Sequence, residues 1–450
     1  MTQPPFSSDE CPARTVWSIA LPAMLTTVAT ALFGLADMWA IGRLGDAPAQ
    51  GAVELGAKFM MALLGVFNFL RTSTIALTAQ ASGRSDLAAQ AGALARALAA
   101  GLGISAVLLL TMPLAIPAGL DLLGASGEVR ASAAAYIGLR YWAGPLWLAN
   151  CVLTGTLIGQ RRVRSVLAVE VAANMVHIAL DLLLVLVVGW GVEGVALATV
   201  SSEALKTVLL AAMVARGGLA RRAMAAARQR ATWHRADLLG LFALNRDLFL
   251  RTLLLNAAFL IFARFGAGQG AATLAANGIL FQLFMLSALI LDGFESAAQV
   301  LCGEALGAQQ RARFRAFVTA SLTGAGIAAL IIALAYGLGG EMFAQLFSTD
   351  PGVIAVLASF SIWAVTMPLA GFASFVLDGV FVGAGWTRAM LGTMLAAFAG
   401  YALLLWLLAP LGNHGLWAAF TLFFVLRGLG QLIVLPRQMR RSFSASSARQ

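Results

Sequence analysis

Apolar stretches of 20 or more residues recur along the whole chain, separated by short polar or glycine-containing breaks. Each stretch is long enough to cross a hydrocarbon core of about 30 Å as a helix. The longest polar segment, 215–237, is rich in Arg and Ala and too short to form a core of its own. We therefore predict an all-α membrane protein of about twelve transmembrane helices. They lie at residues 15–41, 54–80, 88–115, 129–158, 164–188, 193–215, 244–266, 270–302, 314–337, 353–382, 388–410 and 415–436.

The two halves of the chain contain matching motifs at a fixed offset of 224 residues. Leu153-Thr-Gly155-Thr-Leu-Ile-Gly159 corresponds to Leu377-Asp-Gly379-Val-Phe-Val-Gly383, and the same offset relates Gly83 to Gly307 and Gly191 to Gly415. Six helices per copy is an even number, so both copies begin on the same side of the membrane and form a parallel repeat. We expect two six-helix lobes around a central cleft. These are an N-lobe at 1–215, a basic cytoplasmic linker at 216–243, and a C-lobe at 244–450 that ends in a basic tail.

The charge distribution indicates a membrane topology. Hydrophobic residues make up 60% of the chain and charged residues 11%, whereas soluble domains average about 25% charged. The net charge is +10, but arginines concentrate in alternate loops, and the opposite loops carry only Arg43 and Arg130. By the positive-inside rule, both termini are then cytoplasmic. The positive net charge is explained by the membrane topology, so we expect no nucleic-acid partner. The N-terminal region lacks the pattern of a cleaved signal peptide.

Several kinds of chemistry are excluded. The three cysteines are an odd number, and two of them, Cys151 and Cys302, lie within predicted spans, so we expect no disulfide framework or zinc site. Gly189-Trp-Gly191-Val-Glu-Gly194 fits a dinucleotide-binding pattern, but it joins two membrane spans rather than following a strand. We interpret its glycines as turn residues. With three histidines and no HExxH, GxSxG or phosphate loop, the chain is predicted to be no enzyme and to need no cofactor.

Polar residues within the first six spans are candidate functional groups. Placing a charge at the bilayer centre costs about 2.5–3.5 kcal/mol of insertion free energy. Asp37 in span 1 and Asp181 in span 5 are therefore candidates for a functional role. His177 precedes Asp181 by one helical turn, Asn174 lies three residues before it on the same face, and Thr199 is in span 6. We expect a carboxylate desolvated among these His, Asn and Thr side chains to exchange a proton, and we expect Asp37 to be functional as well. The alternatives are a satisfied polar pair and, for His177, a neutral ring bonded to a carbonyl.

The second half carries a different polar set. Asp292, Glu295 and Gln299 lie on one face of span 8, Asp378 lies in span 10, and Arg251 lies in span 7. Arg251 is able to neutralise one of these acids. The sequence leaves two interpretations open, a functional C-lobe polar site or a buried ion-pair network.

Two further charge pairs are placed one helical turn apart. Glu54 and Lys58 in span 2 and Glu203 and Lys206 in span 6 are spaced to neutralise each other. We interpret both as structural pairs.

Pro22 interrupts the apolar run of span 1. It removes a backbone donor and weakens the helix, about 22 Å before Asp37 at the usual helical rise. The sequence is equally consistent with a helix-1 kink that moves during function and with a fixed kink.

These residues together resemble a known family. The opening of the chain, Ala20-Leu-Pro22 and Leu35-Ala-Asp37-Met-Trp-Ala-Ile41-Gly, is similar to that of the multidrug and toxic compound extrusion (MATE) family, in particular its DinF-like branch. Further matching stretches are Leu180-Asp181-Leu-Leu, Gly189-Trp-Gly191-Val-Glu-Gly194 and Leu377-Asp378-Gly379. The resemblance extends over nearly the whole chain.

The resemblance implies a twelve-helix antiporter that exports amphipathic or cationic compounds in exchange for H⁺ or Na⁺. By position, Pro22, Asp37, Asp181 and Thr199 match the kinking proline and the N-lobe cation-site residues of that family. His177 stands where the family usually has Asn, which favours H⁺ but leaves Na⁺ at Asp37 and Asp181 open. In the C-lobe, Gln299 stands where an acid is expected.

The resulting expectation is a secondary antiporter with alternating access and a small-molecule substrate. We expect a multi-pass protein of a bacterial inner membrane, functional as a monomer within the lipid bilayer. The alternative is a flippase of lipids or lipid-linked oligosaccharides with a similar architecture. Such a flippase needs a cationic cavity, whereas these spans hold more acids than free bases.

Overall fold

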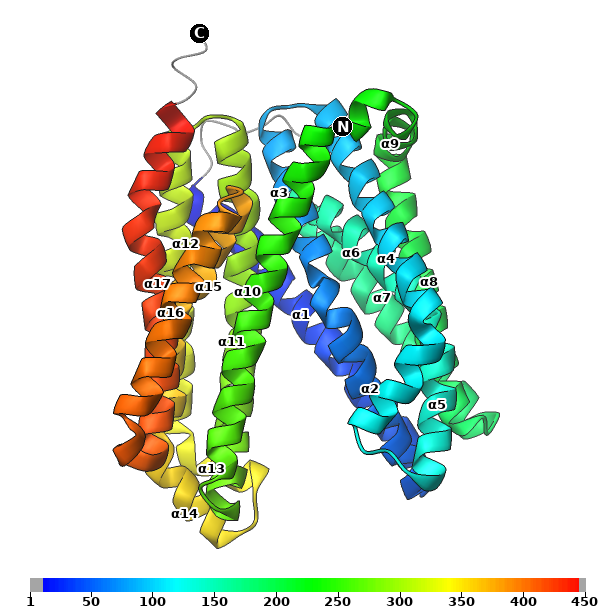
Figure 1. The fold of residues 1–450 in the computed structure, drawn as a ribbon, viewed down its shortest axis with the longest axis vertical. Helices are drawn as coiled ribbons and strands as arrows, with labels where there is room; N and C mark the ends of the chain where they lie inside the picture. The colour runs from blue at the N-terminus through cyan, green and yellow to red at the C-terminus, as the bar shows by residue number, and fades with distance from the viewer. Residues whose placement is uncertain (1–10, 445–450) are drawn as a thin grey trace. The chain divides into compact units, whose positions relative to one another are not determined.

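The computed structural model describes residues 11–444, except for the side chains of residues 31–36, 341, 343 and 344. All regular elements in this part of the chain are helices (Figure 1). The all-α prediction is therefore confirmed.

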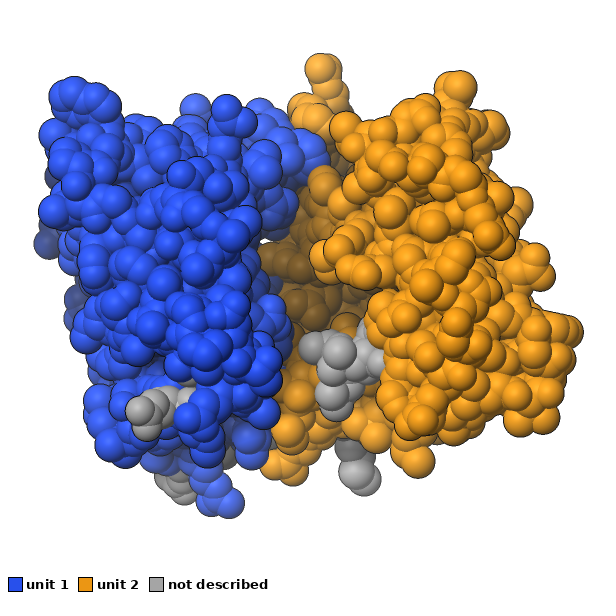
Figure 2. Space-filling view, turned by 90° about the horizontal axis from the view of Figure 1, so that it is seen from below, with its two compact units in different colours: residues 1–24, 83–85, 246–450 blue, residues 25–82, 86–245 orange. Residues whose placement is uncertain are grey.

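The chain forms two compact units, coloured differently in Figure 2. The N unit comprises residues 25–82 and 86–245, and the C unit comprises residues 1–24, 83–85 and 246–450. The sequence placed residues 1–24 with the N-lobe and 216–243 in a separate linker. In the structure, residues 216–245 belong to the N unit instead. The division falls within α1 (Pro12–Gly42), shortly after Pro22, and the helix continues through that proline.

The N unit contains the second part of α1 and the helices that follow it. Asp46 and Asp86 cap two of them, since their Oδ1 atoms accept hydrogen bonds from the amides of Ala49 and Ala89 at 3.0 and 2.8 Å. The remaining elements are α2 (Ala47–Gly65), η1 (Val66–Asn68), α3 (Phe69–Gly83), α4 (Leu87–Leu122), α5 (Gly127–Tyr141), α6 (Ala143–Gly159), α7 (Val163–Asp181), the π-helix η2 (Leu182–Val187), α8 (Gly191–Arg216), α9 (Leu219–Ala227) and η3 (Arg230–Trp233).

The C unit repeats this order. Its elements are α10 (Arg235–Ala267, from residue 246 onwards), α11 (Ala271–Gly307), α12 (Arg311–Leu338), α13 (Gly340–Phe347), α14 (Pro351–Phe360), α15 (Ile362–Gly383), α16 (Thr387–Leu407), η4 (Ala409–Leu411) and α17 (Gly412–Ser444). Ten helical segments of the described chain are long and apolar enough to cross a membrane. The 31-residue α1 and the α5–α6 pair coincide with predicted spans 1 and 4. The prediction of about twelve spans in two six-helix lobes is confirmed.

Backbone geometry reproduces the repeat. Ser85 and Gln309, 224 residues apart, both have left-handed φ angles, 55° and 56°. Arg161 and Gly385 form a second such pair, with φ angles of 60° and 73°. The helices just before these positions end in matched glycines, namely Gly83 and Gly307, and Gly159 and Gly383.

The repeated glycines let helices cross closely. A Cβ atom on Gly155 would meet the carbonyl oxygen of Arg71 in α3, and one on Gly379 would meet the carbonyl oxygen of Glu295 in α11. Gly159 and Gly383 lie in the same way against Ile75 and Gln299. Each contacted pair is itself separated by 224 residues. The motif is thus a helix-packing device in which small residues bring backbones together.

The predicted match between Gly191 and Gly415 was wrong. A Cβ on Gly194 would meet Leu184, and one on Gly415 would meet the equivalent Leu408, so the true partner of Gly415 is Gly194, at an offset of 221. The first copy has a longer connection at this point because it includes the π-helix η2. Gly189 and Gly191 have φ angles of 79° and 50°, which confirms that they are turn glycines.

Candidate functional site

His177 bridges two acids inside the N unit. Its Nε2 atom lies 2.6 Å from Oδ1 of Asp37 on α1 and 3.0 Å from Oδ2 of Asp181, one turn further along α7. All three residues are buried, with at most 2% of their surface exposed. The spacing of His177 and Asp181 predicted a shared helix face, and the structure adds Asp37 from a helix about 140 residues away in sequence.

Asp181 has the less satisfied of the two carboxylates. Its Oδ2 lies 3.0 Å from His177 Nε2, but neither oxygen of Asp181 has a hydrogen bond of good geometry among the described residues. Asp181 is also the last residue of α7 before the helix widens into the π-helix η2. Such π-turns are frequent at functional sites. A buried carboxylate without hydrogen bonds raises the free energy of the folded protein, and binding a proton or a cation removes this penalty.

Ser202 on α8 also lies beside His177. The Oγ atom of Ser202 lies 3.4 Å from Nδ1 of His177 and donates its proton to the carbonyl oxygen of Thr199 at 2.9 Å. The hydroxyl of Thr199 donates to the carbonyl of Val195 at 3.1 Å. The two ring nitrogens of His177 therefore face oxygen acceptors on both sides. The sequence analysis missed Ser202, although its position three residues after Thr199 puts it on the same face of α8.

Asn174 has a different contact from the one expected. Its Nδ2 donates to the backbone carbonyl of Ala29 at 2.7 Å, which ties α7 to α1. This bond fixes the helix that carries His177 and Asp181 against the helix that carries Asp37. Asn174 thus lies next to the site as a helix contact.

Arg140 on α5 is a further charged group near the site, and the sequence analysis missed it. Its Nη1 donates to the hydroxyl of Tyr136, whose ring also lies under the guanidinium at 5.5 Å. The charge of Arg140 acts electrostatically on Asp37. The charge balance of the site therefore includes two carboxylates, one imidazole and one neighbouring guanidinium.

The neighbouring charges form their own pairs. Lys206 bonds Glu170 of α7 at 2.6 Å rather than Glu203, so the predicted Glu203–Lys206 pair was wrong. Glu203 instead accepts a hydrogen bond from Asn150 at 2.7 Å. Tertiary packing overrides the local spacing because α7 lies against α8. The exposed Glu54–Lys58 pair is confirmed at 2.7 Å.

The three site residues lie close enough together that they could share a cation. One ligand atom from each of Asp37, His177 and Asp181 can be chosen so that all lie within 4.8 Å of one another. His177 Nε2 already lies between the two carboxylates at hydrogen-bond distance. Hard cations prefer oxygen ligands, and this group of residues offers oxygen from two carboxylates and nitrogen from one ring.

The C unit contains a buried ion-pair network. Asp378, 1% exposed, accepts hydrogen bonds from Arg251 on α10, from Nη2 of Arg427 at 2.5 Å and from Nε2 of Gln431 at 2.6 Å. Arg427 and Gln431, both on α17, were missed by the sequence analysis. The guanidinium of Arg427 also lies 5.0 Å from the ring of Phe424. This network favours the ion-pair interpretation for Asp378 and Arg251.

Asp292 and Glu295 are half-buried on α11 and act electrostatically on Arg251. Glu295 also lies at the close crossing with α15, where Gly379 packs on its backbone. The structure thus brings these acids near the network around Asp378.

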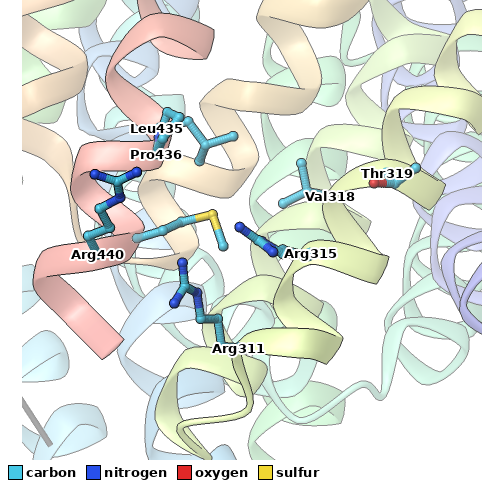
Figure 3. Close-up of a pocket in the computed structure, with 8 residues that line it drawn as sticks. Arg311, Arg315, Val318, Thr319, Leu435, Pro436 and Arg440 are labelled. Atoms are coloured by element: carbon cyan, nitrogen blue, oxygen red, sulfur yellow. The ribbon is translucent and has the colours of Figure 1, made fainter. Parts of the chain in front are cut away.

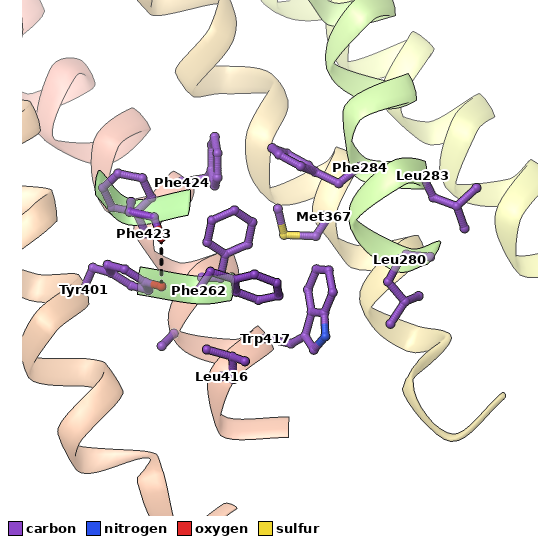
Figure 4. Close-up of a cluster of buried hydrophobic side chains, with 14 of the residues drawn as sticks. Phe262, Leu280, Leu283, Phe284, Met367, Tyr401, Leu416, Trp417, Phe423 and Phe424 are labelled. Atoms are coloured by element: carbon purple, nitrogen blue, oxygen red, sulfur yellow. Dashed lines mark hydrogen bonds between the residues drawn. The ribbon is translucent and has the colours of Figure 1, made fainter. Parts of the chain in front are cut away.

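The positions around His177 have largely apolar counterparts in the described part of the C unit. The repeat equivalents of His177 and Asp181 are Tyr401 and Leu405, and those of Thr199 and Ser202 are Phe420 and Phe423. These residues belong to an apolar cluster, and Figure 4 shows Tyr401 and Phe423 within it beside Phe262, Phe424 and Trp417. The duplication therefore preserved the helix packing while the two units diverged in chemistry.

Cys11, Cys151 and Cys302 are free cysteines, the first exposed and the other two buried.

Comparison with known proteins identifies relatives over almost the full length. The family model described as MatE matches residues 22–183 and again residues 248–407, once in each repeat copy. The chain is 35% identical over 427 residues to DNA damage-inducible protein F of Escherichia coli (strain K12), covering 95% of this chain and 93% of that protein. It is 21% identical to multidrug export protein MepA of Staphylococcus saprophyticus, covering 88% and 87%.

The fold is also similar to solved structures. The Vibrio cholerae MATE transporter VcmN in the bent form superposes with a TM-score of 0.85 at 19% identity, covering 96% of this chain and 98% of that chain. The family model matches well over half of the chain, and the E. coli relative aligns along nearly all of it. The chain therefore belongs to the MatE family of multidrug and toxic compound extrusion transporters.

Proposed function

We propose that this chain is a proton-coupled antiporter that exports small organic compounds, with Asp37, His177 and Asp181 as the site of the coupling ion. The observation that carries the proposal is the buried bridge from His177 Nε2 to both carboxylates, at 2.6 and 3.0 Å. In a low-dielectric environment, one proton decides whether this group of charges is balanced.

Proton binding can drive transport only if the two access states differ in proton affinity. Asp37 is on α1, whereas His177 and Asp181 are on α7, so a displacement of α1 along or away from α7 would break the 2.6 Å bond. We propose that Pro22 is the weak point of α1 that permits this displacement. Proton release would then accompany one of the two access states.

The donor set favours H⁺ over Na⁺ as the coupling ion. An imidazole nitrogen occupies the position between the two acids, where a shared Na⁺ would sit. The Nδ1 atom faces the Ser202 hydroxyl oxygen at 3.4 Å, so a doubly protonated ring has an acceptor at each nitrogen. Replacing the proton by Na⁺ would give up the hydrogen bonds of the imidazolium ring for an incomplete oxygen shell.

The substrate class rests on the relatives. MepA is described as a multidrug export protein, and we propose amphipathic or cationic organic compounds for this chain as well. Family membership supports export over the flippase alternative. The cluster is assembled within the N unit of one chain, which supports function as a monomer.

We propose a bacterial inner-membrane location with both termini in the cytoplasm, on the basis of the arginine distribution. A single cysteine introduced at the exposed Arg228, in a variant lacking the native cysteines, should react with an impermeant thiol reagent only from the cytoplasmic side. A cysteine at Gly412 should react only from outside. The reverse labelling pattern would contradict the orientation and the direction of export.

His177→Asn tests the choice of coupling ion. We expect export to persist and its pH dependence to shift by about one to two units. This follows because a charge-assisted hydrogen bond is worth about 1.5–3 kcal/mol and 1.36 kcal/mol corresponds to about one pH unit. The measurement is efflux rate against pH in inverted vesicles. His234→Asn, at an exposed position in the N unit, is the matched control and should leave the profile unchanged. An unaltered profile for His177→Asn would show that the ring has a structural role.

A further inference from the structure

A cavity of about 350 Å³ lies between the beginning of α12 and the end of α17, both within the C unit. Figure 3 shows Arg311 and Arg315 on α12 and Arg440 on α17 around this space. The remaining lining residues are Val318, Thr319, Leu435, Pro436 and Met439. The lining therefore combines three guanidinium groups with an apolar wall.

The three arginines are available to a ligand. Each is exposed, and none takes part in a salt bridge within residues 11–444. Guanidinium groups bind phosphate oxygens with paired N–H donors, and three around one cavity suit a phosphate-bearing group. A neutral or cationic ligand would leave these charges unmatched.

The walls of the cavity are held in place by aromatic contacts. Phe314 on α12 is fully buried and meets the ring of Phe443 on α17 at 5.5 Å. Phe314 also meets Trp386 at 5.6 Å, and Trp386 Nε1 donates to Ser442 Oγ at 2.9 Å. These contacts fix the end of α17 on α12, so the cavity exists without a ligand and binding needs little ordering.

The position along the helices identifies the source of the phosphate. The arginines lie where the apolar part of α12 begins and that of α17 ends, and for helices that span a bilayer such positions correspond to the headgroup region. Val318 and Leu435 face the same cavity from the membrane side of the arginines. An anionic phospholipid could place its phosphate among the arginines and its first methylene groups along this wall.

We propose that this pocket, formed by Arg311, Arg315, Val318, Thr319, Leu435, Pro436, Met439 and Arg440, binds the phosphate headgroup of an anionic membrane lipid. The proposal is independent of the coupling ion and the exported substrate. It concerns a surface pocket of the C unit.

The test is native mass spectrometry of the purified full-length protein titrated with phosphatidylglycerol or phosphatidylcholine. We expect the wild type to retain phosphatidylglycerol at least about tenfold more tightly than phosphatidylcholine, in view of the attraction of each basic residue for anionic lipid. Replacing Arg311, Arg315 and Arg440 together by Gln should abolish this preference. Thr319→Trp, which fills the cavity without changing charge, should weaken phosphatidylglycerol binding as well.

The control removes the same charge elsewhere. Arg221, Arg222 and Arg228 are exposed on or beside α9 in the N unit, and replacing these three by Gln should leave the lipid preference unchanged. If the control variant loses its preference for phosphatidylglycerol to the same extent, the net charge of the protein explains the preference. That result would contradict a specific lipid site in the pocket. The proposal would also be contradicted if the variant with Gln at positions 311, 315 and 440 kept the full preference for phosphatidylglycerol. If inorganic phosphate competes as strongly as phosphatidylglycerol, the ligand is a soluble anion and the lipid assignment is wrong.

Discussion

Asp37→Asn is expected to reach the membrane in near-normal amounts but to lose coupled efflux by roughly tenfold or more. Asn keeps the size of the side chain and an oxygen that can accept from Nε2 of His177, now 2.6 Å from Asp37. It cannot carry the negative charge. The charge-assisted part of this bond is worth about 1.5–3 kcal/mol, and about 1.4 kcal/mol corresponds to a tenfold change. The measurement is gradient-driven efflux normalised to inserted protein.

Two comparisons make the Asp37 result specific. Asp121→Asn removes an exposed acid that pairs with Arg130 at 2.5 Å, and surface pairs of this kind contribute little, so efflux should stay normal. Asp181→Asn should weaken coupling, and the Asp37/Asp181 double variant should lose less than the sum of the two. Normal coupled efflux by Asp37→Asn would refute the N-unit site and direct attention to Asp292, Glu295 and Asp378. Loss of the inserted protein would assign Asp37 a structural role.

Asp378→Asn is expected to destabilise the protein by about 3–5 kcal/mol. The substitution leaves the guanidinium groups of Arg251 and Arg427 close together without the carboxylate that both contact. Arg427 is 3% exposed, so water cannot replace the lost partner. The measurement is the thermal unfolding of the detergent-solubilised protein, together with the fraction that elutes as a single species.

A second substitution separates charge from shape in this network. The double variant Asp378→Asn/Arg427→Gln lacks one of the two arginine charges that Asp378→Asn leaves unpaired. It should therefore be more stable than Asp378→Asn alone. If Asp378→Asn unfolds at the wild-type temperature but abolishes export, the network is functional rather than structural. That result would reverse our interpretation of the C unit.

The repeat was readable from sequence because it rests on glycine. A side chain at Gly155 or Gly379 would collide with the backbone of a neighbouring helix. Each position therefore requires glycine, and this requirement is visible in the sequence as a repeated motif. The correspondence failed at Gly191 because the π-helix after Asp181 lengthens the first copy. A π-turn depends on the packing around it and has no simple sequence signature.

The candidate site was only partly predictable. Spacing alone placed His177 and Asp181 on one face, whereas the contact with Asp37 depends on how α1 packs against α7, and only the family resemblance indicated it. Arg140 and Arg427 lie within predicted spans, so the cost of a charge in the bilayer was a signal that could have identified both. Lys206 forms its salt bridge with Glu170 and not with Glu203, although Glu203 is nearer in the sequence. Tertiary contacts outweigh local pairing here.

The most direct test of the central claim is efflux from proteoliposomes that contain the purified wild-type protein, with H⁺ and Na⁺ gradients imposed separately. A fluorescent organic cation is a suitable substrate. Our account predicts that an H⁺ gradient alone drives its transport against a concentration gradient, that a Na⁺ gradient alone does not, and that dissipating the H⁺ gradient stops it. Transport driven by Na⁺ at constant pH, or transport indifferent to both gradients, would contradict proton coupling at Asp37, His177 and Asp181.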